Sequence, residues 1–271
     1  MKDNSQLTEK YVTHTVFKEI EYIKEFYDRL SYGCFRFVPL GVMNVYNYAS
    51  YIYLAIQNSL ESINVILTNG AINDACVLVR KLFDDVLVDI YINVLRIDKF
   101  DFQGSNLTVK EVDEWLKSKY RIPTLKKLLK ELETSPSTKD LYPFFGWETY
   151  LKQYREILDD SVHSNRFSRM MLNCKSLVLD NRDKYLDSIS KIINHIFTIH
   201  LSFTFYLNGH YFMASDYVDY LDLGLTPPEE SQKWIAPYAQ EAFDKYIKNN
   251  ECERSQCRPR DKRSENQYCT L

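Results

Sequence analysis

The sequence AINDACVLVRKLFDDVLVDIYINVLRI, residues 71–97, decides the fold because its apolar residues recur at the spacing of one helix face. Side chains three or four positions apart lie on the same side of an α-helix. The preceding pair Asn69-Gly70 is a helix-stop signal, so we expect the helix to begin just after it. The apolar stripe consists of Ala75, Leu78, Leu82, Val86 and Ile90, widened by Phe83, Leu87 and Tyr91.

The segment before this helix, residues 38–67, is a second long helical candidate. No Asp, Glu, Lys or Arg occurs from 37 to 60, a length that could span a bilayer. The segment also carries amides such as Asn44, Asn47 and Gln57, which are costly in hydrocarbon but find hydrogen bonds inside a protein. We therefore predict a buried core helix. Because almost nothing separates it from residues 71–97, the two helices should form an antiparallel hairpin.

Helical patterns on both sides of this hairpin predict an all-α bundle of long antiparallel helices. We expect helices at 7–30, 148–162 and 181–213, with a polar link between the last two. A final helix should open at Thr226-Pro227-Pro228, where proline suits the first turn, and end near 249. In the first of these helices the face toward the core consists of Val16, Ile20, Ile23, Tyr27 and Leu30.

Residues 1–250 are predicted to form one helical domain with a small inserted lobe. The insertion, residues 99–146, is more polar and broken, and we expect short helices at 110–119 and 124–132. Thr108 followed by Glu111 has the spacing of a capping box. The tail, residues 251–271, mixes charges with few apolar side chains and is predicted to be disordered.

Composition and motifs narrow the classes of function. The formal charge is −3 and the sequence pI about 6.0, whereas dedicated nucleic-acid binders are usually more basic. With only 7 Gly, the chain has no phosphate loop, dinucleotide fingerprint, nucleophile elbow or His-Glu-x2-His motif, so we expect no cofactor. The spacing of the tail cysteines, Cys252, Cys257 and Cys269, disfavours zinc. The N-terminus lacks a secretion signal, which predicts a cytoplasmic protein with reduced thiols.

Two separated segments carry residues that suit metal-independent RNA cleavage. Arg80 lies four residues before Asp84 on the predicted helix, so the two side chains share a face. His163 follows the end of a later helix, and Arg155 lies two turns before it. A histidine can move the proton of a 2′-hydroxyl, an arginine can clamp the phosphate, and Asp84 can orient Arg80. We assign substrate contacts to the polar residues that follow, Asn165 and Arg166.

A structural interpretation of the same residues stays open. Arg80 with Asp84 has the spacing of a plain helix ion pair, and His163 is a residue type that the helix dipole favours at a C-terminus. His195 and His200 are five residues apart and do not face one metal ion from one helix. We interpret these two histidines as core or interface residues.

The two segments together resemble bacterial helical proteins of the HEPN-like kind, which include abortive-infection and other defence proteins. The resemblance covers residues 58–165 and rests on the hairpin through Asp74-Ala75-Cys76-Val77-Leu78-Val79-Arg80-Lys81-Leu82-Phe83-Asp84, followed by Ser161-Val162-His163. It implies a helical bundle, a homodimer and RNase activity in a defence or toxin-type system. RNase members of the family carry Arg-x4-6-His in one helix, whereas seven residues separate Arg155 from His163 here. The site is therefore either degenerate or takes its cation from Arg80 on another helix.

Two other classes of function stay open. The 21 Tyr and 15 Phe exceed what one core requires, which favours a non-catalytic scaffold that binds a protein partner through exposed aromatic residues. Two uncharged stretches, at 37–60 and 192–215, keep a membrane-associated protein as a weaker alternative, although their amides and histidines favour a protein interior.

Overall fold

The computed structural model describes residues 7–36, 48–100, 109–163, 165–174, 182–230 and 234–248. Within these ranges the chain is helical, with no strand beyond an isolated antiparallel bridge between Met213 and Ile235. The predicted all-α class is therefore confirmed. The predicted helix start at 38–47, the cap at Thr108 and the tail at 251–271 lie outside the described residues.

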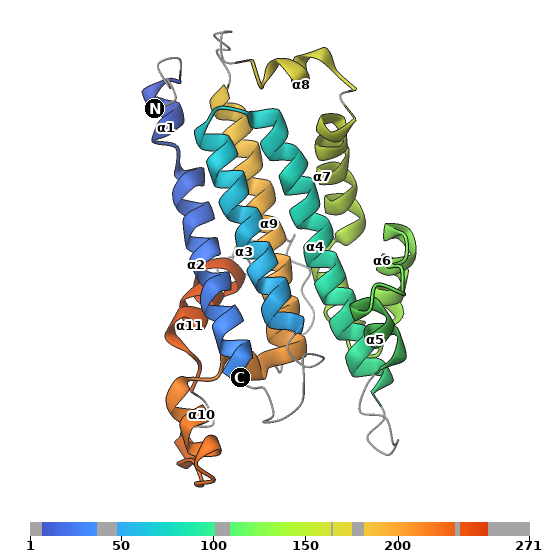
Figure 1. Ribbon diagram of the computed structural model, residues 1–271, viewed down its shortest axis with the longest axis vertical. Coiled ribbons are helices and arrows are strands. Elements are labelled where there is room, and N and C mark those ends of the chain that lie inside the picture. The colour runs from blue at the N-terminus through green and yellow to red at the C-terminus, as the bar shows by residue number, and fades with distance from the viewer. Residues whose placement is uncertain are drawn as a thin grey trace, which may run out of the picture.

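Four long helices form the bundle: α2 (Thr15–Arg36), α3 (Tyr48–Thr68), α4 (Ile72–Lys99) and α9 (Arg182–Asn208) (Figure 1). The reversal between α3 and α4 depends on Gly70, whose φ of 77° lies in the left-handed region. Its N–H donates to the carbonyl of Leu67 (2.7 Å), and the N–H of Ala71 donates to Ile66 (3.2 Å). These bonds satisfy the last carbonyls of α3, and the predicted antiparallel hairpin follows.

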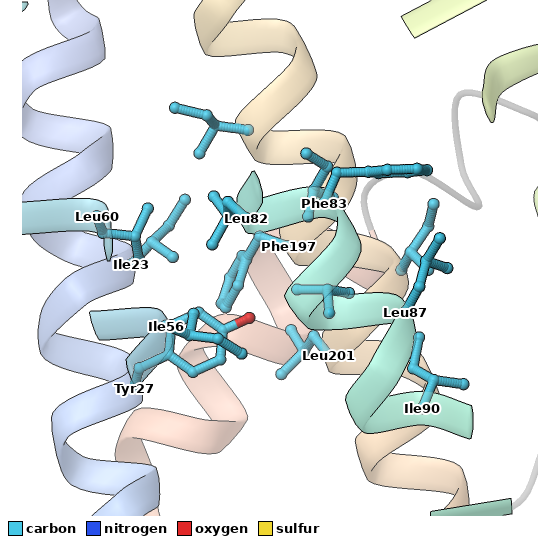
Figure 2. Close-up of a cluster of buried hydrophobic side chains, with 14 of the residues drawn as sticks. Ile23, Tyr27, Ile56, Leu60, Leu82, Phe83, Leu87, Ile90, Phe197 and Leu201 are labelled. Carbon is cyan, nitrogen blue, oxygen red and sulfur yellow. The ribbon is translucent and has the colours of Figure 1, made fainter. Parts of the chain in front are cut away.

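The core lies where α2, α3, α4 and α9 meet, and Figure 2 shows its central cluster. All five residues predicted on the core face of α2 are buried, and so is the predicted stripe of α4 except Leu78. Leu78 is only partly buried because Cys76 and Val79 occupy the core positions beside it. Each large aliphatic or aromatic side chain removed from water contributes about 1.5–3 kcal/mol. The labelled members of the cluster include Tyr27, Ile56, Leu60, Phe83 and Phe197.

The first predicted helix is two helices, α1 (Glu9–Val12) and α2, with a break at Thr13 and His14. Thr8 caps α1, because its Oγ1 accepts a hydrogen bond from the N–H of Tyr11 (3.2 Å). His14 Nδ1 accepts from the N–H of Val16 (3.1 Å), which caps the start of α2 in the same manner. Apolar spacing alone does not show such a break, because both helices keep their apolar residues toward the core.

The inserted segment forms α5 (Lys110–Leu116), α6 (Leu125–Thr134) and a 3-10 turn, η1 (Tyr142–Phe145), which pack on the lower half of α4 (Figure 1). The hydroxyl of Tyr91 in α4 donates to Glu131 in α6 (2.6 Å). The N-cap of α5 is Val109, which makes no side-chain cap, and the predicted cap residue Thr108 lies outside the described residues.

The last third of the chain differs most from prediction. The predicted polar link contains α8 (Phe167–Met171), and α9 ends at Asn208 in a 3-10 turn, η2 (Gly209–Phe212). The helix predicted from Thr226 to about 249 does not begin at Thr226, because residues 225–228 are not helical. α10 (Ser215–Asp222) ends two residues before Gly224 (φ 66°). α11 (Pro237–Phe243) begins later and continues as a π-helical turn, η4 (Asp244–Lys248), close to the predicted end. Proline does open a helix here, but at Pro237.

Candidate functional site at the interface of α4 and α7

Helix α7 (Trp147–Val162) packs along α4 and runs antiparallel to it (Figure 1). Arg80 on α4 contacts Asp159 on α7. One turn earlier on α4, Cys76 lies against Ser161, which is buried. Burial raises the pKa of the Cys76 thiol, and the neighbouring Ser161 side chain opposes this increase. Ser161 therefore belongs to the packing between the two helices.

Arg80 is the most enclosed charged group of the predicted site. Its side chain is only 10% exposed, and its guanidinium lies 5.8 Å from the ring centre of Phe83. Nε donates to Asp159 Oδ1 (2.9 Å), and Nη1 forms an ion pair with Asp84. Partial burial alone would lower the pKa of Arg80, but the two carboxylates outweigh it and raise that pKa. Arg80 is thus a permanently charged group held in one orientation.

Arg155 approaches the same carboxylate from its own helix. Its Nε donates to Asp159 Oδ2 (3.2 Å), so the two oxygens of Asp159 each accept from a different arginine. Both arginines are held by Nε. Among the described residues, no acceptor bonds Nη2 of Arg80 or either Nη of Arg155. The two Nη groups of Arg155 form a fork of the kind that binds phosphate oxygens, and Nη2 of Arg80 is a further donor.

Asp159 is the residue that the sequence interpretation missed. Partial burial would raise the pKa of this carboxyl, but the hydrogen bonds from Arg80 and Arg155 outweigh it and lower the pKa below its ordinary value. The available signal was the spacing of Arg155 and Asp159, four residues apart on one helix. No pattern in the sequence pairs Asp159 with Arg80, because they lie on separate helices.

His163 caps the C-terminus of α7, and its backbone N–H donates to the carbonyl of Asp159 (2.9 Å). It therefore lies one turn beyond Asp159, with an exposed side chain. None of the described residues accepts from or donates to its imidazole. Asn165 is exposed, and Arg166 pairs with Asp160 (3.0 Å) rather than with Arg80 or Arg155. The structure brings Arg80, Asp84 and Arg155 together around Asp159. Of the other three predicted residues, only His163 contacts that group, through its backbone N–H, and none does so through a described side-chain hydrogen bond or ion pair.

A second polar cluster lies inside the bundle. His200 is 1% exposed and bonds the hydroxyl of Tyr27 through Nδ1 (2.7 Å) and Asp89 Oδ2 through Nε2 (2.8 Å). Asn93 donates to Asp89 Oδ1 (3.1 Å) and accepts from Asn208 (3.0 Å). The prediction that His200 is a core histidine is confirmed. The charge of Asp89 within the core was not anticipated, because an isolated Asp on a helix gives no sign of its partner.

The described ranges contain no group of three or more His, Cys, Asp and Glu side chains arranged to hold a metal ion. None of the helices in those ranges combines the length and apolar character that a bilayer crossing requires. Comparison of the chain with protein-family models, with curated proteins and with solved structures found no match.

Proposed function

We propose that the chain is a HEPN-like helical protein of a prokaryotic defence or toxin-type system that cleaves RNA without a metal ion. The observation that carries this proposal is the shared carboxylate of Asp159, which holds Arg80 and Arg155 by Nε and leaves Nη2 of Arg80 and both Nη groups of Arg155 for a substrate. His163 follows one helical turn later and faces solvent.

The electrostatics favour a phosphodiester as the group bound there. Arg80 pairs with both Asp84 and Asp159, so the two arginines and two carboxylates are formally neutral together. The guanidinium of Arg155, which only shares Asp159, is the less compensated of the two positive charges. A phosphodiester carries one negative charge and two free oxygens, which suit the Nη fork of Arg155 and the remaining Nη2 donor of Arg80. Arg80 makes the deeper contact, because it is mostly buried, and Arg155 makes the contact nearer the surface.

The proposed reaction is transfer of the phosphoryl group to the neighbouring ribose oxygen. The imidazole of His163 takes the proton of the 2′-hydroxyl, and the bond from O2′ to phosphorus forms as the bond to O5′ breaks. The arginines stabilise the charge that develops on the phosphoryl oxygens. O5′ leaves with a proton, and the products are a 2′,3′-cyclic phosphate and a 5′-hydroxyl. A homodimer would bring a second histidine, so that one imidazole accepts a proton while the other donates one.

The test is cleavage of a labelled single-stranded RNA by the purified full-length protein in the presence of EDTA. We expect fragments that end in 2′,3′-cyclic phosphate, and at least a hundredfold loss of rate in His163→Ala. His210→Gln, a histidine in η2 at the other end of the bundle, is the matched control and should cleave at the wild-type rate. Equal rates in all three proteins, or activity that EDTA abolishes, would contradict the proposal.

A second candidate function, a scaffold that binds a protein partner, is favoured by apolar side chains beside the same site. Phe167 in α8 is 74% exposed, and Val162 and Met170 are also exposed. Phe167→Ala distinguishes the two functions. It should leave RNA cleavage measurable if the arginine site is the functional one, whereas an inactive protein whose oligomeric state or partner binding depends on Phe167 would favour the scaffold.

A further inference from the structure

The buried polar cluster continues from Asp89 to the far end of α4 and ends at Arg96. Nη2 of Arg96 donates to Oδ1 of Asn208, and the same nitrogen lies 3.5 Å from Oδ1 of Asn93. Its Nε is buried, and no acceptor among the described residues bonds it. The described residues place no carboxylate within ion-pair distance of this guanidinium. A partly buried arginine whose direct acceptors are neutral amides is unusual, because charges removed from water are ordinarily paired.

Asp89, the carboxylate of this cluster, does not form an ion pair with Arg96. Its Oδ2 is hydrogen-bonded to His200 and its Oδ1 to Asn93. Both carboxylate oxygens therefore have partners other than Arg96. Asn93 lies between the two charges and accepts from both Arg96 and Asn208. Asp89 thus acts on Arg96 only through space, across an amide side chain.

Other groups that favour an anion gather around Arg96 from separate elements. The 3-10 turn η2 begins directly after Asn208, which accepts from Arg96, and it brings Tyr211 beside the guanidinium. Tyr211 retains its own proton, because burial raises its pKa. His210, the residue before it, reaches the surface. Partial burial, and then the charge of Arg96, lower the pKa of His210. The remaining ionisable side chains that act on Arg96 or Tyr211 are Tyr48, Tyr53, Cys34 and Asp89.

We propose that Arg96, Tyr211 and His210 form a binding site for an oxyanion, the carboxylate or phosphate group of a small molecule. The guanidinium supplies charge and parallel N–H donors, the Tyr211 hydroxyl supplies a third donor, and His210 becomes a fourth when protonated. Arg96 is only partly buried and His210 is exposed, so the site opens at the surface where α4 ends beside η2. The site does not depend on the proposed RNase activity.

An anion at this site must change the protonation of His210. A bound negative charge beside the imidazole favours its charged form, so the pKa of His210 rises toward its ordinary value. By linkage, the same anion binds more tightly as the pH falls through the pKa of His210. Removing the charge of Arg96 also raises that pKa, but it abolishes the response to the anion. A purely structural arginine would give no saturable response.

The experiment follows the imidazole of His210 by NMR in the full-length protein, assigned by comparison with His210→Gln. Inorganic phosphate and acetate are titrated separately at constant ionic strength against chloride. We expect a saturable rise in the pKa of His210, and at least a tenfold loss of affinity in Arg96→Gln. Arg121→Gln, an exposed arginine in the inserted segment, is the matched control and should respond as wild type does. A response to phosphate alone, or to acetate alone, supports the site and shows whether it binds phosphate or carboxylate groups.

If Arg96→Gln does not fold, Tyr211→Phe serves in its place, because it removes one hydroxyl and keeps the charge. We expect it to weaken binding about threefold to tenfold. The site is refuted if neither anion changes the titration of His210, if Arg96→Gln responds like wild type, or if Tyr211→Phe binds with unchanged affinity.

Discussion

Replacing Asp159 by asparagine should destabilise the protein by removing the charge that two arginines share. Breaking a buried ion pair costs about 3–5 kcal/mol, whereas exposed pairs are worth about 0–1 kcal/mol. Asp159 lies between these limits, since its side chain is 33% exposed and that of Arg80 is 10% exposed. Arg80 also keeps its second partner, Asp84, and the asparagine oxygen can still accept one hydrogen bond. We therefore expect a loss of about 2 kcal/mol at pH 7.

The assay is urea and thermal unfolding of wild type and Asp159→Asn, followed by circular dichroism. A loss of this size lowers Tm by about 4–8 °C in a chain of this length. Asp244→Asn is the matched control, because Asp244 is half exposed and pairs only loosely with Lys248, 3.6 Å away. It should cost less than about 0.5 kcal/mol. If the two substitutions lower the free energy of unfolding by the same amount, Asp159 is an ordinary surface carboxylate and the prediction is wrong.

The pH dependence gives an independent check of the same residue. The folded-state pKa of Asp159 lies below its unfolded value, which is about 3.9 for an aspartate. The contribution of Asp159 to the free energy of unfolding is therefore fully present at pH values above its unfolded-state pKa. It is lost as the pH falls through the folded-state pKa. The difference in stability between wild type and Asp159→Asn should shrink below about pH 4. A difference of the same size at pH 3 and pH 7 would show that the asparagine acts through something other than charge.

Two further substitutions test the fold. Gly70→Ala should cost about 1–2 kcal/mol in urea unfolding, because φ is 77° and the added Cβ would lie 3.1 Å from Cδ2 of Leu7; an unchanged midpoint would show that the turn relaxes freely. Tyr91→Phe should loosen the inserted segment by removing the bond to Glu131, which hydrogen exchange would register as faster exchange in α6 with α3 unaffected; equal protection of α6 in both proteins would contradict this.

The fold was largely predictable because the sequence of each long helix shows the regular spacing of apolar residues that marks one helix face. The core faces of α2 and α4 follow from residues such as Val16, Ile20, Val86 and Ile90, which need no knowledge of their partners. The C-terminal third was less predictable. There the helices are short, and Pro227 and Pro237 offer equally good starts. The described α-helix begins at Pro237. Short helices owe their existence to tertiary contacts more than to local pattern.

The candidate site was predictable only in part, since its contacts cross between helices. Arg80 with Asp84 follows from spacing within α4, and the structure pairs them. The contact of Arg80 with Asp159 joins residues far apart in sequence, and the link of Asp89 to His200 does the same. Each single residue looks like an ordinary charge on a helix. Only the packing of α4 against α7 and α9 selects which charges meet.

Helix α4 carries both proposed sites, and this arrangement makes their tests separable. Arg80 and Arg96 lie about 24 Å apart along the axis, at about 1.5 Å per residue. Substitutions that far apart with no shared partner add in their effects on stability. A variant such as His163→Ala should therefore leave the anion response of His210 unchanged, and Arg96→Gln should leave RNA cleavage unchanged unless it unfolds the helix. Coupling between the two ends would mean that the polar cluster around Asp89 transmits a change along α4, and both proposals would then describe one site rather than two.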